Sequence, residues 1–339
     1  MDDCSPDNTQ EVANSFHDPR VVYIRNDHNV GNLRNYNKGV RMSRGKYVWL
    51  ISADDYLRRP YVLERYVRVM EQYPNVGYSL CPGVVVRHGQ ERETLGYSVY
   101  GKKDRIFEGR TLLKRLVKSN VVVAASALVR RQCYNNSSPF PLQVEWAGQK
   151  VVMRWVGDWY LWCLFALDYD VAYFAEPMVC YRDHQLSMTS TITGQSVQTR
   201  QECASADISV PWVIRQMMIE RGMEGLSRGC LHAAANAYAR HADTLGIEAC
   251  EESLCRGTEV EGERNWVRAR MSAAMGDISY WQGDLERAKK LYRIGLRRDP
   301  AMARVYVKLL LLAFGAHGDR ARKLLRLAKG KSAIIGANS

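Results

Sequence analysis

The apolar residues in the first half of the chain form short unbroken runs that alternate with helix-like stretches. The clearest run, 47–51, is followed within three residues by two adjacent carboxylates, Asp54 and Asp55. An unbroken run rich in β-branched and aromatic residues is typical of a strand buried on both faces of a parallel sheet. A shorter run at 21–24 has the same character, and a helix is predicted over 33–43 between the two runs.

A second helix is predicted after Pro60, with Leu63, Val67 and Met70 on its inner face and its end at Tyr73. The order strand, helix, strand, helix predicts a doubly wound α/β domain.

The last third of the chain has a different pattern. From about Arg200 onward strand patterns disappear and helix formers dominate. Helices are expected over 233–242, 267–274, 284–297, 301–314 and 319–329. Small and aromatic residues near 269–302 match one tetratricopeptide unit: Gly276, Ala288, Tyr292, Gly295 and Pro300. One unit cannot bury its own face, so these helices should pack on each other or on the preceding domain. A generic helical tail is the alternative.

Charge narrows the classes of partner. The 339 residues include 48 Lys and Arg and 36 Asp and Glu, a net charge of +12. This balance favours anionic partners such as sugar nucleotides, acidic glycans, membrane headgroups or nucleic acid. Because basic residues occur along the whole chain with no arginine-rich tail, a nucleic-acid partner is disfavoured.

Cysteine usage and hydropathy indicate a compartment. Nine cysteines are scattered along the chain without a Cys-x-x-Cys pair or zinc-like spacing. No apolar run approaches the roughly 20 residues that span a bilayer, and no secretory signal begins the chain. We therefore expect a cytoplasmic protein, a location compatible with peripheral contact at the inner face of the membrane.

The acid pair offers the first functional hypothesis. Ligands of open α/β sheets bind just beyond the carboxyl ends of the strands, which is where Asp54 and Asp55 are expected. Two adjacent acids are costly unless a positive charge compensates them, commonly a divalent cation that holds a phosphorylated ligand. A solvated Asp-Asp turn is the alternative, and this stretch alone does not choose between them.

An ordered set of motifs supports the first hypothesis. In the first part of the chain these are Asp2-Asp3-x-Ser5-x-Asp7-x-Thr9, Asn29-x-Gly31, Asn37-x-Gly39, Arg44-Gly45-x-Tyr47 and Ala53-Asp54-Asp55. Further along they are Ala125-Ser126-x-Leu128-Val129-Arg130-Arg131, Gly157-Asp158-Trp159 and Tyr181-Arg182-x-His184. In order and spacing the set resembles family 2 glycosyltransferases with the GT-A fold, over roughly residues 1 to 195. The expected organisation is thus a catalytic domain over 1–195 and a helical region over 196–339.

The resemblance implies an inverting, metal-dependent transfer of a sugar from a nucleotide-diphospho-sugar, with uridine the expected nucleoside. The acceptor would be a hydroxyl of a glycan or of a lipid-linked molecule, and the cofactor Mg²⁺ or Mn²⁺. The implied roles are metal binding for Asp55 and His184, nucleotide-sugar binding for Asp3, Asp54 and Arg182, and general base for Asp158. Simpler readings stay open: Asp3 in a frayed terminus, and Asp158 as a helix N-cap. The loop 187–193 could close over the donor as a lid or be a plain linker.

Two departures from the family pattern bear on this expectation. Relatives begin with a strand, a loop and a helix ahead of the first acid pair, so we expect a truncated sheet that lacks its first strand. Many relatives also carry Glu where this chain has Gly157. The alternative function is therefore a helical-repeat interaction module that carries an inactive transferase domain.

Two other enzyme classes are disfavoured. A phosphate-loop nucleoside triphosphatase would need Gly where Leu325 precedes Gly330-Lys331-Ser332. A hydrolase with paired carboxylates would need a second acid set opposite Asp55, and the sequence gives no sign of one.

Overall fold

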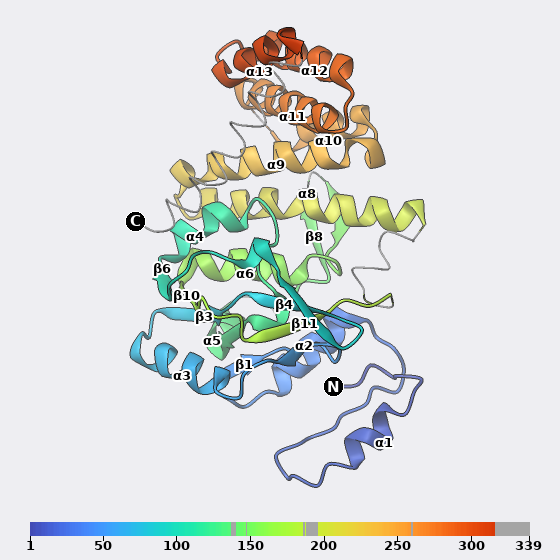
Figure 1. Ribbon diagram of the computed structural model, residues 1–339, viewed down its shortest axis with the longest axis vertical. Helices are drawn as coiled ribbons and strands as arrows, with labels where there is room; N and C mark the ends of the chain where they lie inside the picture. The colour runs from blue at the N-terminus through green and yellow to red at the C-terminus, as the bar shows by residue number, and fades with distance from the viewer. Residues whose placement is uncertain (137–139, 147, 186, 188–195, 259, 316–339) are drawn as a thin grey trace.

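The computed structural model describes residues 1–136, 140–146, 148–185, 187, 196–258 and 260–315. A mixed α/β part comes first, and a series of helices follows it and stacks above it in sequence order (Figure 1). The expected fold class, an α/β domain followed by an all-helical region, is confirmed. None of the described helices is long and apolar enough to cross a membrane.

The main sheet has five strands in the order β1-β7-β3-β10-β6. Only β3 and β10 run parallel, so the sheet is mixed rather than doubly wound and parallel. Its strands are β1 (Tyr47–Trp49), β3 (Val76–Leu80), β6 (Arg105–Phe107), β7 (Leu128–Arg130) and β10 (Asp170–Tyr173).

A second sheet of four strands brings the Tyr181-Arg182-x-His184 motif to the acid pair. Its order is β2-β11-β4-β5, with β11 antiparallel to β2 and parallel to β4. Because Cys180 of β11 pairs with Tyr56 of β2, Arg182 lies beside the acid pair that precedes β2. The strands are β2 (Tyr56–Leu57), β4 (Gly83–Arg87), β5 (Gln90–Thr94) and β11 (Val179–Arg182); β8 (Gln143–Trp146) and β9 (Gln149–Val152) form a separate hairpin.

The expectation of a parallel strand buried on both faces at 47–51 is wrong. Among the described residues β1 pairs only with β7, antiparallel, and it forms the edge of the sheet. Val48 is buried, but Tyr47 and Trp49 are half-buried and Ile51 is exposed. An apolar run looks the same in sequence whether a second strand or an open cavity lies beside it.

The run at 21–24 forms no strand. Its region makes only an isolated parallel bridge between Asp2 and Arg25. Asp2 is buried and accepts hydrogen bonds from Ser5, Tyr23 and Arg25. Burial alone would raise the pKa of Asp2, but these hydrogen bonds and the charge of Arg25 outweigh it and lower the pKa well below its usual range.

The helices of the α/β part follow the predicted pattern, with one error. The predicted helices appear as α2 and α3, but the buried face of α3 is Val62, Tyr66 and Met70, and Leu63 is exposed. The helices are α1 (Thr9–Asn14), α2 (Asn32–Met42), α3 (Val62–Gln72), α4 (Gly109–Leu116), α5 (Arg131–Asn136) and α6 (Gly157–Asp168), with 3-10 turns η1 (Gly96–Ser98) and η2 (Ala124–Ser126).

Helix α6 forms the centre of the core. Every residue from Trp159 to Leu167 is buried, which is the pattern of a helix surrounded by other elements. The indole of Trp159 donates a hydrogen bond to the carbonyl of Leu116 at the end of α4, at 2.6 Å. Because α6 is fixed on all sides, its first turn, which carries Asp158, is held in place.

The helical region packs on the α/β part, as expected. Val210, Ile214 and Met218 of α8 belong to the same apolar core as α6, and Trp212 stacks on Trp146 of β8 with ring centroids 5.7 Å apart. The predicted boundary at 195 therefore does not separate two cores. The helices are α8 (Val197–Glu220), α9 (Glu224–Leu245), α10 (Ile247–Gly257), α11 (Glu261–Trp281), α12 (Leu285–Arg298) and α13 (Ala303–Ala313); the predicted helix at 319–329 lies outside the described residues.

Helices α11 and α12 pack through the small and aromatic residues that suggested a tetratricopeptide unit. Tyr292 is fully buried against Gly276, and its hydroxyl donates to Asp277 at 2.6 Å. A Cβ added at Gly276 would lie 2.6 Å from the Tyr292 ring. The assignment to that repeat class stays a prediction.

Gly276→Ala should destabilise the protein by about 1–3 kcal/mol, because the added methyl group overpacks the contact with Tyr292. Gly229→Ala in α9 is the matched control: nothing lies within 4 Å of the new Cβ. Alanine there should be neutral or stabilise by up to about 1 kcal/mol. Urea unfolding of both variants measures this. Equal stability of the two variants would show that Tyr292 does not pack on Gly276 as described.

Candidate active site

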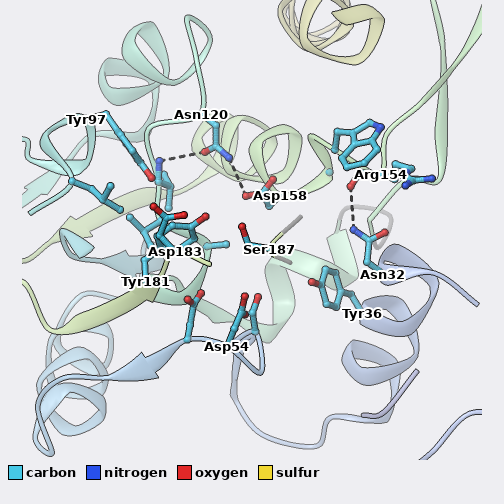
Figure 2. Close-up of a pocket in the computed structure, with 18 of the residues that line it drawn as sticks. Asn32, Tyr36, Asp54, Tyr97, Asn120, Arg154, Asp158, Tyr181, Asp183 and Ser187 are labelled. Carbon is cyan, nitrogen blue, oxygen red and sulfur yellow. Dashed lines mark hydrogen bonds between the residues drawn. The ribbon is translucent and has the colours of Figure 1, made fainter. Parts of the chain in front are cut away.

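A cavity of about 450 Å³ lies where the end of β1, the β4–β11 pair and the start of α6 meet. Figure 2 shows carboxylates on several of its walls, with Asp54 on one side, Asp158 across from it and Asp183 beside Tyr181. Asp55 lines the same cavity. Four acids facing one space make it a site for cations, hydroxyl groups or both.

The acid pair sits in a turn that Arg182 holds. The Asp55 amide donates to the Ser52 carbonyl at 3.0 Å and closes the turn. From β11, the Arg182 backbone N–H donates to Asp55 Oδ1 at 3.0 Å, and its guanidinium donates to the carbonyl oxygens of Asp54 and, at 3.3 Å, Ala53. Arg182 is thus where the sequence placed it, beside the acid pair, but part of its guanidinium binds the turn itself. A guanidinium has five N–H donors, so others remain for a phosphate group.

His184, which the sequence assigned to metal binding together with Asp55, contacts Asp54 in the structure. Its Nε2 lies 3.1 Å from Asp54 Oδ2, whereas Asp55 is engaged by Arg182. Both His184 and Asp54 are partly exposed, with side-chain exposures of 43% and 35%. The pair borders an open groove beside Arg87 and Arg182.

The ionised form of Asp55 is disfavoured by its surroundings. Burial, and then the neighbouring charge of Asp54, raise its pKa to about 6, although the backbone N–H of Arg182 opposes the shift. A carboxyl group in this state gains from any cation that enters the site.

The residues fit a divalent metal that the substrate helps to hold. Within the described part of the chain no three His, Cys, Asp or Glu side chains stand close enough to hold a metal by themselves. Mg²⁺ does not need such a set, because it is commonly bound by one or two carboxylates together with waters and substrate phosphates. Asp54 and Asp55 supply the two carboxylates.

Asp158 lies in the first turn of α6 but is not its N-cap. The N-cap position is Val156, and no side chain caps the helix. Asn120 Nδ2 donates to Asp158 Oδ2 at 3.0 Å, from the loop after α4 (Figure 2). Burial raises the pKa of Asp158, while the Asn120 hydrogen bond partly offsets this. A carboxylate with a raised pKa in a cavity wall is suited to accept a proton.

Gly157 is explained by packing. A Cβ there would lie 2.9 Å from Leu33 of α2 and 3.4 Å from Phe140. The absent side chain allows α2 to approach the start of α6, which brings Tyr36 of α2 to the cavity.

Asp3 lies outside the cavity lining. Its Oδ1 accepts from the Asn26 side chain and the Val30 amide, and its Oδ2 accepts from the Gly31 amide, each at 2.9 Å. These bonds fix the loop that leads into α2. Asp3 is therefore not a residue of a frayed terminus, and its role toward a nucleotide stays a prediction.

Several wall residues had no signal in the sequence. Asn120 is in a loop without a motif, and Tyr97 lies in η1, so neither stands out from the pattern. Asp183 sits inside the Tyr181-Arg182-x-His184 motif at its variable position, and it accepts a hydrogen bond from Arg87 at 2.7 Å. The Arg154 guanidinium lies 4.2 Å from the centre of the Trp155 ring, just ahead of α6. Both residues precede Asp158 by only a few positions, so their nearness to Asp158 in the sequence is a signal.

A second cavity of about 440 Å³ continues from the first along the free edge of β1. It shares Tyr36, Ser52 and Asp158 with the first cavity and also touches Met1. Asp158 is therefore reached from two sides. Of the loop 187–193, Ser187 lines the first cavity; residues 188–193 lie outside the described residues, so the predicted lid is untested.

Comparison with known proteins agrees with this picture. Residues 1–136 match the family described as Glycosyl transferase family 2. A stretch of 73 residues is 32% identical to an uncharacterized glycosyltransferase of Methanocaldococcus jannaschii. This stretch is 21% of this chain and 25% of the relative. The chain thus spans about a quarter of the length of that relative. The family match covers residues 1–136, and the helical C-terminal region follows beyond it.

Asp158 should titrate above the ordinary aspartate pKa of about 3.9, and Asn120→Ala should raise its pKa further by removing the opposing hydrogen bond. Carbon-detected NMR of the carboxyl group, assigned with Asp158→Asn, measures both values. Because the folded pKa exceeds the unfolded one, stability should fall as pH rises from about 4 through the folded pKa. Asp158→Asn should remove that part of the fall. An ordinary pKa for Asp158 would contradict the burial argument.

Proposed function

We propose that the protein is an inverting, metal-dependent glycosyltransferase that moves a sugar from a nucleotide-diphospho-sugar to a hydroxyl of a glycan or lipid-linked acceptor. The observation that carries the proposal is the pairing of two kinds of carboxylate across one cavity. Asp54 and Asp55 form a pair of carboxylates suited to bind a cation on one side, and Asp158, with its raised pKa, lies across from them.

The donor would bind on the acid-pair side. Its diphosphate would lie near Asp55 and the free N–H groups of Arg182, and the ribose near Asp54. Mg²⁺ or Mn²⁺, when bound at Asp55, would supply positive charge to the departing diphosphate. His184 supports this arrangement by orienting Asp54 through the 3.1 Å contact. Asp3 would act at the nucleotide base or by fixing the loop into α2.

The acceptor would enter on the Asp158 side. Asp158 takes the proton from the acceptor hydroxyl as that oxygen forms a bond to the anomeric carbon of the sugar. The bond between this carbon and the diphosphate oxygen breaks, and the electron pair leaves with the diphosphate. One displacement with one base inverts the anomeric centre. Asn120 holds the base in place, and Tyr97 and Tyr181 offer apolar faces and hydroxyls to a sugar ring.

The alternative, an interaction module with an inactive domain, predicts the same fold without the chemistry. It is disfavoured by the cavity, since both the acid pair and Asp158 face it. The experiments below separate the two functions, because a module without activity would fail both.

Uridine diphosphate should bind more tightly with Mn²⁺ or Mg²⁺ than with a chelator, because the metal screens the charges of the diphosphate and the acid pair. Asp55→Ala should abolish this gain, and Asp104→Ala, at a distant surface ion pair, should keep it. Isothermal titration calorimetry measures both. Equal affinity with metal and with chelator would overturn the metal assignment.

Asp158→Asn should leave nucleotide affinity nearly unchanged and lower turnover on the order of a hundredfold or more, the scale of a lost general base. The isosteric amide keeps the hydrogen bond with Asn120 but cannot take a proton. Product formation from a labelled donor, together with calorimetry, separates the two effects. If the variant loses nucleotide affinity or unfolds, Asp158 has a structural role instead.

A further inference from the structure

The net charge of the protein is concentrated at one end of the chain. Residues 285–339 contain 14 Lys and Arg against three Asp and Glu, whereas residues 1–284 contain 34 against 33. Basic residues occur throughout the chain, but over residues 1–284 taken together the acids nearly equal them in number. The excess of +11 therefore belongs to α12, α13 and the residues that follow.

A cationic cluster lies beside this segment, around the indole of Trp266 on α11. The Arg270 guanidinium lies 4.4 Å and the Arg228 guanidinium 5.7 Å from the ring, and His232 of α9 is edge-on to it at 6.4 Å. Together with Lys118 and Arg304, which lie near His232, these residues form the cationic cluster.

Lys118 and Arg304 approach this group from other elements, the end of α4 and the start of α13. Burial, and then the charges of Lys118, Arg270 and Arg304, lower the pKa of His232, so each of these three cations lies near the His232 ring. Arg270 is paired with Asp299 at 2.5 Å. Within the described part of the chain Lys118, Arg228 and Arg304 have no ion-pair partner, and all three are exposed.

An apolar stripe adjoins the cluster on the outer face of α13. Val305 and Leu312 of this helix face inward and are buried. The opposite face exposes four large apolar side chains: Tyr306 at 49%, Val307 at 55%, Leu310 at 59% and Phe314 at 61%. Val307 follows Arg304 by three residues, one helical turn, so the stripe and the cluster share a border.

We propose that the cationic cluster and the apolar stripe together dock the protein on the surface of an anionic lipid bilayer. Lys and Arg near such a surface are attracted to its headgroups, and a helix face with exposed apolar side chains buries them at the headgroup boundary. An indole is also suited to that depth. Both halves of the surface are needed for this partner.

Other occupants fit less well. A nucleic acid would use the cations but leave the apolar stripe in water. Residues 316–339 carry six Lys and Arg and one Asp, the same sign of charge as the cluster, so charge does not draw them to it.

Lys118 also lies two residues before Asn120, which binds Asp158. If the proposed function holds, docking here would bring a lipid-linked acceptor toward the base; the docking itself does not depend on it.

The test is sedimentation of the full chain with extruded vesicles. The protein should bind vesicles with 30% phosphatidylglycerol in phosphatidylcholine and should bind pure phosphatidylcholine vesicles far more weakly. Affinity for the anionic vesicles should fall steeply as salt rises, because the attraction is screened. Equal binding to both vesicle types, or to neither, would overturn the proposal, as would tight binding to a duplex RNA with no vesicle binding.

Variants locate the surface. Lys118→Gln, Arg228→Gln and Arg304→Gln together should weaken binding to anionic vesicles on the order of a hundredfold, at about fivefold for each cation. Arg41→Gln, Lys102→Gln and Lys103→Gln remove the same charge from exposed positions elsewhere and should change it only severalfold. Equal losses in the two triple variants would show a general charge effect and overturn the assignment to the cluster.

The apolar stripe is tested by Leu310→Ser with Phe314→Ser. This variant should bind vesicles about tenfold more weakly, and the loss should be seen mostly in the binding that persists at high salt. Its thermal midpoint should stay unchanged because both side chains are exposed. Unchanged vesicle binding would show that the stripe does not contact the bilayer, and a clearly lowered midpoint would show that the chain itself covers it. Either result would overturn the proposal.

Discussion

The site depends on keeping two adjacent carboxylates, Asp54 and Asp55, together in one turn. Arg182 achieves this with its backbone as well as its side chain, since the N–H binds Asp55 and the guanidinium binds the peptide carbonyls of the turn. The pairing of β11 with β2 sets the register that makes these contacts available. The remaining electrostatic cost shows in the raised pKa of Asp55. The fold thus fixes the geometry of the acid pair and leaves its charge to be satisfied by a ligand.

The opposite wall is fixed in a different way. Asp158 stands on a helix that is buried on all its faces, so its position is set by apolar packing rather than by ion pairs. Gly157 lets α2 approach closely, and Asn120 orients the carboxylate from the loop after α4. One wall of the cavity is therefore held by hydrogen bonds and the other by the core. A substitution in the core of α6 would move Asp158 without touching the acid pair.

Sequence patterns predicted the parts that local rules determine. The helices α2 and α3, the helical last third and the meeting of Arg182 and His184 with the acid pair follow from periodicity or from ordered motifs. What failed depends on neighbours far along the chain: β1 is an edge strand with a cavity beside it, and α3 buries Tyr66 instead of Leu63. The partner of His184 and the role of Asn120 also arise from contacts between distant segments, which leave no local pattern. The charge count of the whole chain likewise hid its concentration in residues 285–339.

The packing of helix α8 determines which parts of the molecule unfold together. Its residues Val210, Ile214 and Met218 lie in the same core as α6, and Trp212 stacks on Trp146. Local opening events usually follow units that share a core rather than units defined by motif. Backbone amides of α6 and α8 should therefore exchange with solvent in one cooperative event, and a fragment cut at residue 195 would leave α6, the helix that carries Asp158, with one side exposed to water. The packed unit that holds Asp158 therefore extends beyond residue 195.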